Sequence, residues 1–348
     1  MSRRKYGFGV VGCGVISDTH LSAIQSLPNA EVIAVCDTRE SAAQAKAEQF
    51  GCAWYTDLAE MLKRDDIHVC NIVVPSGLHA KLGIQCAEAG KHVICTKPID
   101  ITLERIDALI TAAERNHVLV GATHQSRSYA VYKRLKHAIL DGRLGKLLYG
   151  NAIVPWYRSE EYYSDGWHGT KKLDGGGALI NQSIHYIDLL LWMMGNPVQV
   201  FGLADNLGHR SIEVEDCASA VIQFENGAQG VIQGTTCTYK GHPQRLEVHG
   251  TQGNVIIAGD ELQLWEVEGD ETEYHPGEGR TGGSADPKKG MGAEAVQAHA
   301  EQIGDLLAAA EEGRQPVLNG QEARRAVELI LAIYRASETR QAVTLPLR

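Results

Sequence analysis

The stretch Gly7-Phe8-Gly9-Val10-Val11-Gly12-Cys13-Gly14-Val15-Ile16-Ser17 decides the fold. The apolar run Tyr6 to Val11 leads directly into a G-x-G-x-x-S motif, which predicts a strand, a tight turn and a helix. Gly12 permits the turn, Gly14 lets the backbone approach a pyrophosphate, and the helix N-terminus offers its N–H groups to the anion. Ser17 stands where a third glycine is common, and it is small enough for close packing of helix and strand.

An acidic residue ends the next apolar run. Asp37 follows Gly12 by 25 residues, near the spacing of about 20 at which a carboxylate binds the adenosine ribose. Such a carboxylate repels a 2′-phosphate, so we expect NAD as the cofactor. Arg39 softens that preference, which keeps NADP as an alternative. The other interpretation of Asp37 is a cap on the helix that follows it.

The first 120 residues alternate short apolar runs with helical patterns, which is typical of a parallel βαβ sheet. We therefore predict a doubly wound Rossmann domain over residues 1–122. The predicted strands are Tyr6 to Val11, Glu31 to Cys36, Val69 to Val74, His92 to Cys95 and Val118 to Gly121. The predicted helices between them are Ser41 to Phe50, Leu58 to Arg64, His79 to Ala89 and Leu103 to Arg115.

The pattern changes after a helix over Tyr129 to Leu140. Residues 123–348 are predicted to form an α+β domain with a large, mostly antiparallel open sheet, in which Asn226-Gly227 marks a hairpin. Two closing helices are expected to pack back near the first domain, and Gly269 to Gly292 is expected to be a surface loop. The predicted strands are Leu147 to Trp156, Cys217 to Glu225, Ala228 to Thr238, Gln244 to Gly250 and Asn254 to Ala258, and the closing helices are Ala293 to Glu312 and Gln321 to Ser337.

Composition excludes several classes of protein. With 348 residues and 44% hydrophobic residues, the chain suits about two globular domains. A net charge of −10 disfavours nucleic acid and anionic membranes as partners. We see no signal peptide and no apolar stretch long enough to span a bilayer. Eight scattered cysteines without zinc spacing predict reduced thiols in a cytoplasmic protein and no metal.

Two further segments carry candidate chemistry. Lys97 follows a predicted parallel strand, where open α/β folds bind ligands; the alternative is a surface lysine. In a predicted helix over Ala178 to Met194, a polar stripe lies along an apolar face. Its members are Asn181, His185, Asp188 and Trp192.

Polar side chains on such a helix must face a partner or a cavity, because burying them unpaired costs about 1–3 kcal/mol each. His185 is therefore a candidate general acid or base, with a hydrogen-bonded core histidine as the alternative. Asp188, one turn further on, is a candidate to fix the tautomer of His185. Metal binding by His168 and His185 lacks a third ligand at any suitable spacing.

Essentially the whole chain resembles the glucose-fructose oxidoreductase/inositol dehydrogenase/MocA (Gfo/Idh/MocA) family. The motifs that carry the resemblance are Gly12 to Ser17, Pro75-Ser76-Gly77-Leu78-His79, Thr96-Lys97-Pro98, Gly142-Arg143-Leu144-Gly145 and Asp174 to His185. In that family a lysine and a D-x-x-x-H pair surround the substrate carbinol, which implies Lys97, Asn181 and His185 as catalytic residues. The resemblance also implies a cis Lys97–Pro98 peptide and homodimers or homotetramers formed through the second sheet.

This chain departs from the family pattern at two positions. Thr96 replaces the usual Glu, which removes a carboxylate near the nicotinamide. Asn181 replaces the usual Asp, as in the branch with G-G-G-A-L-x-N-Q that oxidises pyranose rings. Because an amide cannot accept a proton, the base must be His185 or Lys97.

The resulting hypothesis is an NAD-dependent dehydrogenase that oxidises a secondary ring hydroxyl of a hexopyranoside or a sugar derivative. Inositols and nucleotide-linked sugars are alternative substrates, and a non-catalytic NAD-binding regulatory protein is the alternative of another class. The candidate cofactor residues are Gly12, Gly14, Val15, Ile16, Asp37, Arg39, Pro75, Ser76, His79, Thr96, Lys97 and Gln125. The candidate substrate residues are Lys97, Arg127, Trp156, Arg158, Trp167, His168, Asn181 and His185.

Overall fold

The computed structural model describes residues 5–269 and 292–347. The chain divides into two compact units, Met1–Ser128 with Pro287–Arg324 and Tyr129–Asp286 with Arg325–Arg348. Most of the predicted loop at 269–292 lies outside the described residues.

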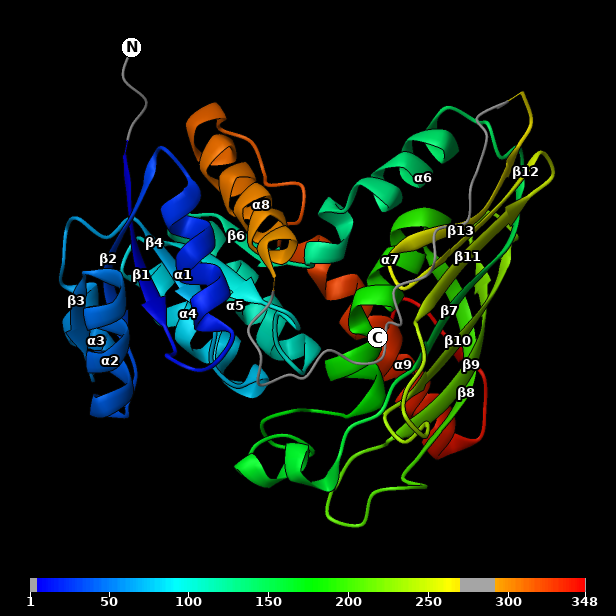
Figure 1. Ribbon diagram of the computed structural model, residues 1–348, viewed down its shortest axis with the longest axis horizontal. Helices are drawn as coiled ribbons and strands as arrows, with labels where there is room; N and C mark the ends of the chain where they lie inside the picture. Colours follow the sequence, from blue (N-terminus) through cyan, green and yellow to red (C-terminus); the bar gives the residue numbers. More distant parts are fainter. Residues whose placement is uncertain (1–4, 270–291, 348) are drawn as a thin grey trace. The chain divides into compact units, whose positions relative to one another are not determined.

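The first unit contains a six-stranded sheet with the order β3-β2-β1-β4-β5-β6 (Figure 1). All five strand pairs are parallel, so the predicted Rossmann sheet is confirmed. The short β3 was not predicted. The strands are β1 (Tyr6–Val11), β2 (Ala30–Cys36), β3 (Ala53–Tyr55), β4 (Val69–Ile72), β5 (His92–Thr96) and β6 (Val120–Thr123).

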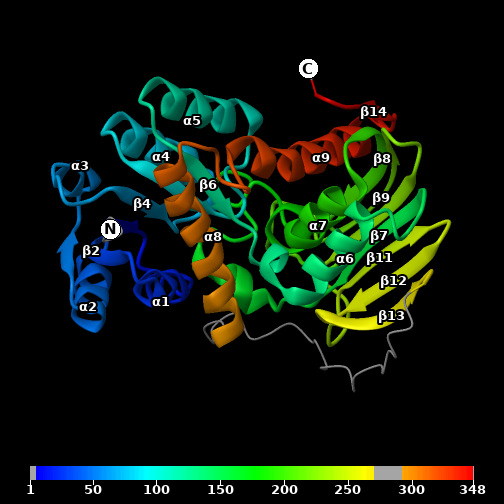
Figure 2. The ribbon, with the colours of Figure 1, turned by 90° about the horizontal axis from the view of Figure 1, so that it is seen from above.

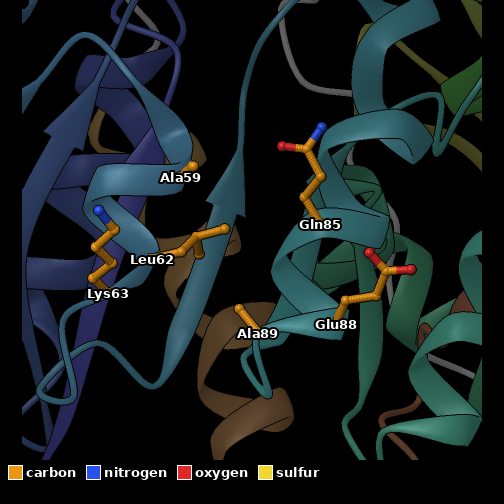
Figure 3. Close-up of a pocket in the computed structure, with 6 residues that line it drawn as sticks. All are labelled: Ala59, Leu62, Lys63, Gln85, Glu88 and Ala89. Carbon is orange, nitrogen blue, oxygen red and sulfur yellow. The ribbon is translucent and has the colours of Figure 1, made fainter.

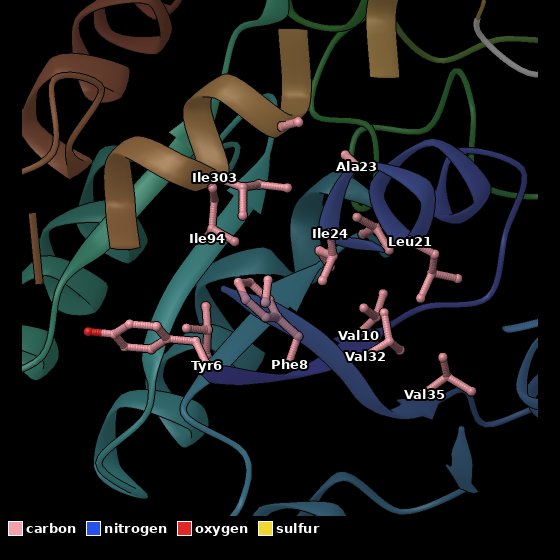
Figure 4. Packing of buried hydrophobic residues seen from close by; sticks show 14 of the residues in the cluster. Tyr6, Phe8, Val10, Leu21, Ala23, Ile24, Val32, Val35, Ile94 and Ile303 are labelled. Atoms are coloured by element: carbon pink, nitrogen blue, oxygen red, sulfur yellow. The ribbon is translucent and has the colours of Figure 1, made fainter. Parts of the chain in front are cut away.

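Helices cover both faces of this sheet. The α1 and α8 helices pack side by side on one face (Figure 2), and α4 and α5 pack together on the other. Residues from β1, α1 and α8 share one core (Figure 4), in which Phe8 and Ile303 are fully buried. The helices are α1 (Ser17–Ser26), α2 (Glu40–Phe50), α3 (Leu58–Leu62), α4 (His79–Glu88), α5 (Leu103–Arg115) and α8 (Ala293–Glu312), with short 3-10 turns η1 (Ser76–Leu78) and η2 (Gln125–Ser128).

The second unit contains an eight-stranded sheet with the order β13-β12-β11-β7-β10-β9-β8-β14. It is mostly antiparallel, as predicted, with β7 and β10 parallel. The predicted hairpin joins β9 to β10, and Gly227 adopts φ 83° in its turn. The strands are β7 (Leu147–Pro155), β8 (Pro197–Asp205), β9 (Cys217–Phe224), β10 (Gln229–Thr235), β11 (Arg245–Gly250), β12 (Gly253–Ala258), β13 (Glu261–Val267) and β14 (Val343–Thr344).

Helices lie on one face of this second sheet (Figure 1). The α7 helix packs on β7 and β11, where Gly150 leaves room for Met194 and Leu190. The helical segments are α6 (Ala130–Leu140), η3 (Glu160–Asp165), η4 (Ala178–Ser183), α7 (Ile184–Met194) and α9 (Gly320–Thr339), of which α9 begins in the first unit and ends in the second.

The structure also bears on the Lys97–Pro98 peptide, the cysteines and the search for a membrane-spanning helix. The Lys97–Pro98 peptide is cis, as the family resemblance implied. All eight cysteines are free, and five of them are buried. Among the described residues, no helix has the length and hydropathy needed to cross a membrane.

Candidate active site

The predicted cofactor residues gather at one edge of the first sheet. Each group follows the carboxyl end of a parallel strand or forms its last residue, where doubly wound folds bind ligands. Gly12 to Ile16 follow β1, and Asp37 and Arg39 follow β2. Pro75 and Ser76 follow β4, and Gln125 follows β6. Thr96 is the last residue of β5, and Lys97 comes directly after it.

The G-x-G turn has the geometry that a bound pyrophosphate requires. Gly12 adopts φ 108°, and a Cβ there would lie 2.6 Å from the Val73 carbonyl oxygen. At Gly14 a Cβ would meet no described atom within 4 Å, so this side of the turn is open to a ligand. The Ser17 hydroxyl donates to the Gly14 carbonyl at 2.6 Å and so ties the turn to the first residue of α1. These residues fit a dinucleotide.

Asp37 is held in place by two neighbours. Its carboxylate accepts hydrogen bonds from the Cys13 N–H at 2.9 Å and from the backbone and guanidinium of Arg39. Burial raises the pKa of Asp37, but these hydrogen bonds outweigh burial and the net pKa is lowered. Asp37 is therefore an anion at neutral pH, and it links the G-x-G turn to the end of β2.

His79 is fully buried inside the first unit. Its Nδ1 lies 2.7 Å from the Pro98 carbonyl oxygen and its Nε2 lies 2.7 Å from the Val74 carbonyl oxygen. The ring therefore joins the loop before Pro75 to the loop after Lys97. Burial lowers the pKa of this imidazole.

Arg127 was predicted to bind substrate. The structure pairs its guanidinium with Glu322 at 3.0 Å, and its side chain is buried. Both residues belong to the first unit. The structure therefore gives Arg127 an internal ion pair.

The segment that carries Asn181 and His185 differs from the prediction. Instead of one α-helix over 178–194, η4 is a π-helical turn and α7 begins only at Ile184. Asn181 lies in the π turn, so the α-helical spacing of the stripe applies only from His185 onward. Asn181, His185 and Asp188 are all buried. Isolated π turns of this kind are frequent at functional sites.

A buried carboxylate explains where the π turn begins. Glu215 accepts hydrogen bonds from the N–H groups of Gly177 and Leu179 at 2.9 and 2.8 Å and from the Tyr334 hydroxyl at 2.8 Å. Its own carbonyl accepts the Ala178 N–H. Because an α-helix leaves its first N–H groups unpaired, Glu215 stabilises this start. Burial raises the pKa of Glu215.

A second buried carboxylate contacts Asn181 directly. Asp174 Oδ1 accepts a hydrogen bond from Asn181 Nδ2 at 2.6 Å, and Asp174 Oδ2 accepts one from the Gly169 N–H at 2.8 Å. Asp174 is only 1% exposed. A polar contact of this kind keeps Asn181 in one orientation.

Aromatic rings surround the predicted substrate residues of the second unit. The Arg158 guanidinium lies 5.3 Å from the ring centres of Trp156 and Tyr162, and it donates to Gln182 at 2.6 Å. Burial lowers the pKa of Arg158. The His168 ring packs 3.6 Å from Trp167 and 4.3 Å from Tyr162, between centroids. Flat apolar faces with nearby donors suit a sugar ring.

Sequence reasoning gave no role to Asp174, Glu215 or Asp216. Asp216 accepts hydrogen bonds from the Leu207, Gly208 and His209 N–H groups, which outweigh burial and lower its pKa. Asp174 stood inside a recognised motif, and Glu215-Asp216 is an acidic pair just before an apolar run. Only the folded chain brings these carboxylates to the backbone groups that they bind.

One surface pocket lies away from all of these residues. It has a lining of α3 and α4 side chains (Figure 3), among them Leu62 and Gln85. The pocket contains none of the predicted cofactor, catalytic or substrate residues, so it has no part in the proposed chemistry.

Both units resemble known proteins. Residues 6–124 match a model described as an oxidoreductase family with an NAD-binding Rossmann fold, and residues 132–256 match the GFO/IDH/MocA C-terminal domain. Levoglucosan dehydrogenase of Pseudarthrobacter phenanthrenivorans is 31% identical over 74% of this chain and 75% of its own. Myo-inositol 2-dehydrogenase of Thermotoga maritima is 28% identical over 71% and 74%.

A solved structure covers nearly the whole chain. The WlbA dehydrogenase of Bordetella pertussis, crystallised with NADH and UDP-GlcNAcA, superposes with a TM-score of 0.87 at 30% identity, over 99% of this chain and 100% of that one. Levoglucosan dehydrogenase in complex with NADH and levoglucosan superposes with a TM-score of 0.86 at 23% identity, which supports the fold alone.

Proposed function

This chain belongs to the GFO/IDH/MocA oxidoreductase family, and from that premise we propose that it oxidises a secondary ring hydroxyl of a sugar to a ketone with NAD, reversibly. The observation that carries the proposal is the buried pair Asn181, in the π turn, and His185, in the first turn of α7. Burying polar side chains of this kind costs free energy. The Glu215 carboxylate binds the backbone at the start of the segment that carries both residues.

The cofactor is held by the strand-end residues of the first unit. We assign the pyrophosphate to Gly12 and Gly14 and the adenosine ribose to Asp37. When bound, NAD supplies the acceptor for the hydride that leaves the carbinol carbon. Thr96 ends β5, and Pro75 follows the neighbouring strand β4.

The catalytic roles follow from the chemistry of three side chains. His185 removes the hydroxyl proton as the carbonyl forms, and Lys97 donates a hydrogen bond to the developing alkoxide. Asn181 orients the reacting hydroxyl or the imidazole. We expect His185→Ala or Lys97→Ala to lower kcat by about 10²–10⁴-fold.

A second candidate substrate is a nucleotide-linked sugar. The similarity to the WlbA dehydrogenase over the whole chain supports it. So does Arg158, a buried guanidinium between two aromatic rings, because arginine binds carboxylates and phosphates with two hydrogen bonds. Arg127 offers less support, because Glu322 already pairs with it.

One spectrophotometric experiment tests the function and separates the two substrate classes. Purified protein is mixed with NAD or NADP and with free hexoses, glycosides, inositols or UDP-sugars, and reduced nicotinamide is followed by its absorbance. Turnover with a free sugar supports the first candidate, and turnover with UDP-sugars alone supports the second. Cofactor binding without turnover on any compound would contradict both.

We also propose that two copies associate through the face of the second sheet opposite α7. On this face Phe201 lies opposite Val221, and Val221 lies opposite Val231. Phe201 is 38% exposed and Val221 is 55% exposed. An exposed apolar row of this kind marks an association surface. A cytoplasmic location is supported by the eight free cysteines.

A further inference from the structure

The hydrogen bond between Asp174 and Asn181 determines how the Asn181 amide can act. A carboxylate accepts hydrogen bonds and cannot donate them when ionised, so the group 2.6 Å from Asp174 must be the amide nitrogen. We propose that Asp174 is a positioning residue for the dehydrogenase reaction: it fixes the Asn181 amide in one orientation, with the carbonyl oxygen directed away from Asp174. This inference rests on the proposed function.

Asp174 is itself held rigidly. Its second oxygen accepts the Gly169 N–H at 2.8 Å, and the Asp174 and Gly175 N–H groups both donate to the Thr170 carbonyl. Gly169 adopts φ 75° and packs against Ile212, where a Cβ would lie 2.6 Å from a side-chain carbon. With 1% exposure, the carboxylate has no room to turn away from Asn181.

This contact explains why an amide stands at position 181. An Asp at 181 would place a second carboxylate at hydrogen-bonding distance from Asp174, and like charges at that distance cannot both stay ionised. One of the two would have to keep a proton. With Asn181, a single charge accepts a hydrogen bond from a neutral donor. Asp174 and Asn181 thus form one hydrogen-bonded unit, and an Asp at 181 beside an ionised Asp174 would be unfavourable.

The fixed orientation sets the polarity that Asn181 offers to substrate. With its nitrogen toward Asp174, the amide presents an acceptor oxygen, which suits a sugar hydroxyl or an imidazole N–H. A flipped amide would present a donor and would compete with Lys97 for the developing alkoxide. Asp174 therefore acts on the reaction through Asn181 and does not itself contact substrate.

Three phenols interact electrostatically with Asp174. They are Tyr162, Tyr163 and Tyr334, and burial raises the pKa of each, that of Tyr163 to about 12. All three stay neutral between pH 4 and pH 9. Glu215 lies beyond Tyr334, hydrogen-bonded to its hydroxyl, and is unchanged in every variant below. A pH dependence that appears in Asn181→Asp and disappears in the double variant would therefore come from positions 174 and 181.

Three variants test the pair by reciprocal exchange: Asp174→Asn, Asn181→Asp and the double variant that carries both. In Asp174→Asn the amide at 181 loses its fixed orientation, and we expect kcat to fall by about 10–100-fold with a smaller change in KM. We expect Asn181→Asp to lose at least as much. The double variant restores one carboxylate and one amide with exchanged positions, so kcat should recover to within about tenfold of the wild type.

Thermal unfolding as a function of pH measures the contact without any turnover. In Asn181→Asp the two carboxylates share a proton, so their folded pKa rises above the unfolded value of about 4. The shared proton therefore stabilises the folded Asn181→Asp variant at a pH below the unfolded pKa. This stabilisation is lost as the pH rises through the folded pKa. The Tm deficit of Asn181→Asp against the wild type should therefore grow between pH 4 and pH 8, and the double variant should remove this growth.

The outcomes separate this inference from the proposed function. Wild-type protein that reduces NAD, with unchanged kcat and pH profile in Asp174→Asn, would overturn the role of Asp174. A Tm deficit of Asn181→Asp that does not change with pH, or that the double variant leaves in place, would overturn the contact. Wild-type protein that binds NAD but oxidises no sugar would overturn the proposed function, whatever the Tm curves show.

Discussion

Asp37 has a structural role, and we propose that it also recognises the cofactor. Its carboxylate ties the G-x-G turn through the Cys13 N–H and pairs with the exposed Arg39 side chain. The same negative charge repels a 2′-phosphate, while Arg39 would attract one. We therefore expect the preference for NAD over NADP to depend on the opposing charges of Asp37 and Arg39.

We expect Asp37→Ser to move the preference toward NADP. The substitution removes the charge that disfavours the 2′-phosphate and releases Arg39 to bind it. The ratio of kcat/KM for NAD over NADP should fall by at least about tenfold. Asp37→Asn is the matched control, because it keeps an acceptor for the Cys13 N–H. An unchanged ratio in both variants would mean that Asp37 does not face the ribose.

His79 makes a prediction about stability. His79→Ala removes the ring that packs against the Val74 and Pro98 carbonyls and the one N–H that a neutral imidazole donates to either of them, and an unsatisfied buried group costs about 1–3 kcal/mol. We expect the free energy of unfolding to fall by about 2–5 kcal/mol, measured with denaturant. His137→Ala, at an exposed position on α6, should change it by less than about 0.5 kcal/mol. Equal effects would contradict the internal role of His79.

At this scale the sequence predicted residues whose roles follow from local spacing. Gly12, Gly14 and Asp37 could be proposed because a turn and a ribose-binding carboxylate recur at a characteristic separation. The contact between Asp174 and Asn181 was not found, since it depends on a closed turn at Gly169 and on the π turn. The ion pair of Arg127 with Glu322 could not be predicted either, because the two residues lie 195 positions apart in the chain.

At the scale of elements, the start of η4 and α7 depends on two glycines. A Cβ at Gly177 would lie 2.1 Å from the Glu215 carbonyl oxygen, and one at Gly176 would lie 2.2 Å from the Tyr334 hydroxyl. Gly177 therefore lets the chain pass close to Glu215, which binds the first N–H groups of the π turn. The close contact between Gly177 and Glu215 therefore helps to determine where Asn181 and His185 lie.

Gly177→Ala should displace this start and impair activity. The new methyl group overlaps backbone, so the segment must move, and we expect kcat to fall by at least about tenfold and stability by about 1–3 kcal/mol. The matched control is Gly304→Ala inside α8, where a Cβ would meet Leu27 at an ordinary 3.5 Å. That variant should keep full activity and gain about 1 kcal/mol. A fully active Gly177→Ala protein would contradict the account of this turn.

Elements with strong apolar periodicity were predicted well. The strand at β1 and the helix at α5 have the bounds that the sequence indicated. The π turn was not predicted, because the apolar residues of η4 continue the spacing of α7 and the signal for the change is the distant Glu215. β8 and β13 were missed as well.

At the scale of the whole molecule, we propose that one face of the second sheet associates with a second copy of the chain. The outward residues of β8, β9 and β10 at its centre are apolar or uncharged. They include Phe201, Val221 and Val231, which form one row across three strands. The centre of this face, over β8 to β10, offers a second copy of the chain an uncharged surface.

Val221→Glu should separate the associated copies. A charge at the centre of the row would be buried on association, which costs several kcal/mol. Light scattering coupled to gel filtration should show a lower mass than for the wild type. Leu140→Glu, at a 69% exposed position on α6, is the control and should leave the mass unchanged. A wild-type mass equal to one chain, 37.8 kDa, would contradict association through this face.

The central claim is that this chain moves a hydride from a sugar ring carbon to NAD with His185 as the base. The most direct measurement incubates the protein with NAD and sugars deuterated on carbon, and then determines the isotopic mass of the nicotinamide product. The account predicts deuterium in the reduced cofactor with wild-type protein and its near absence with His185→Ala. Reduced cofactor without deuterium, or equal transfer by His185→Ala, would contradict it.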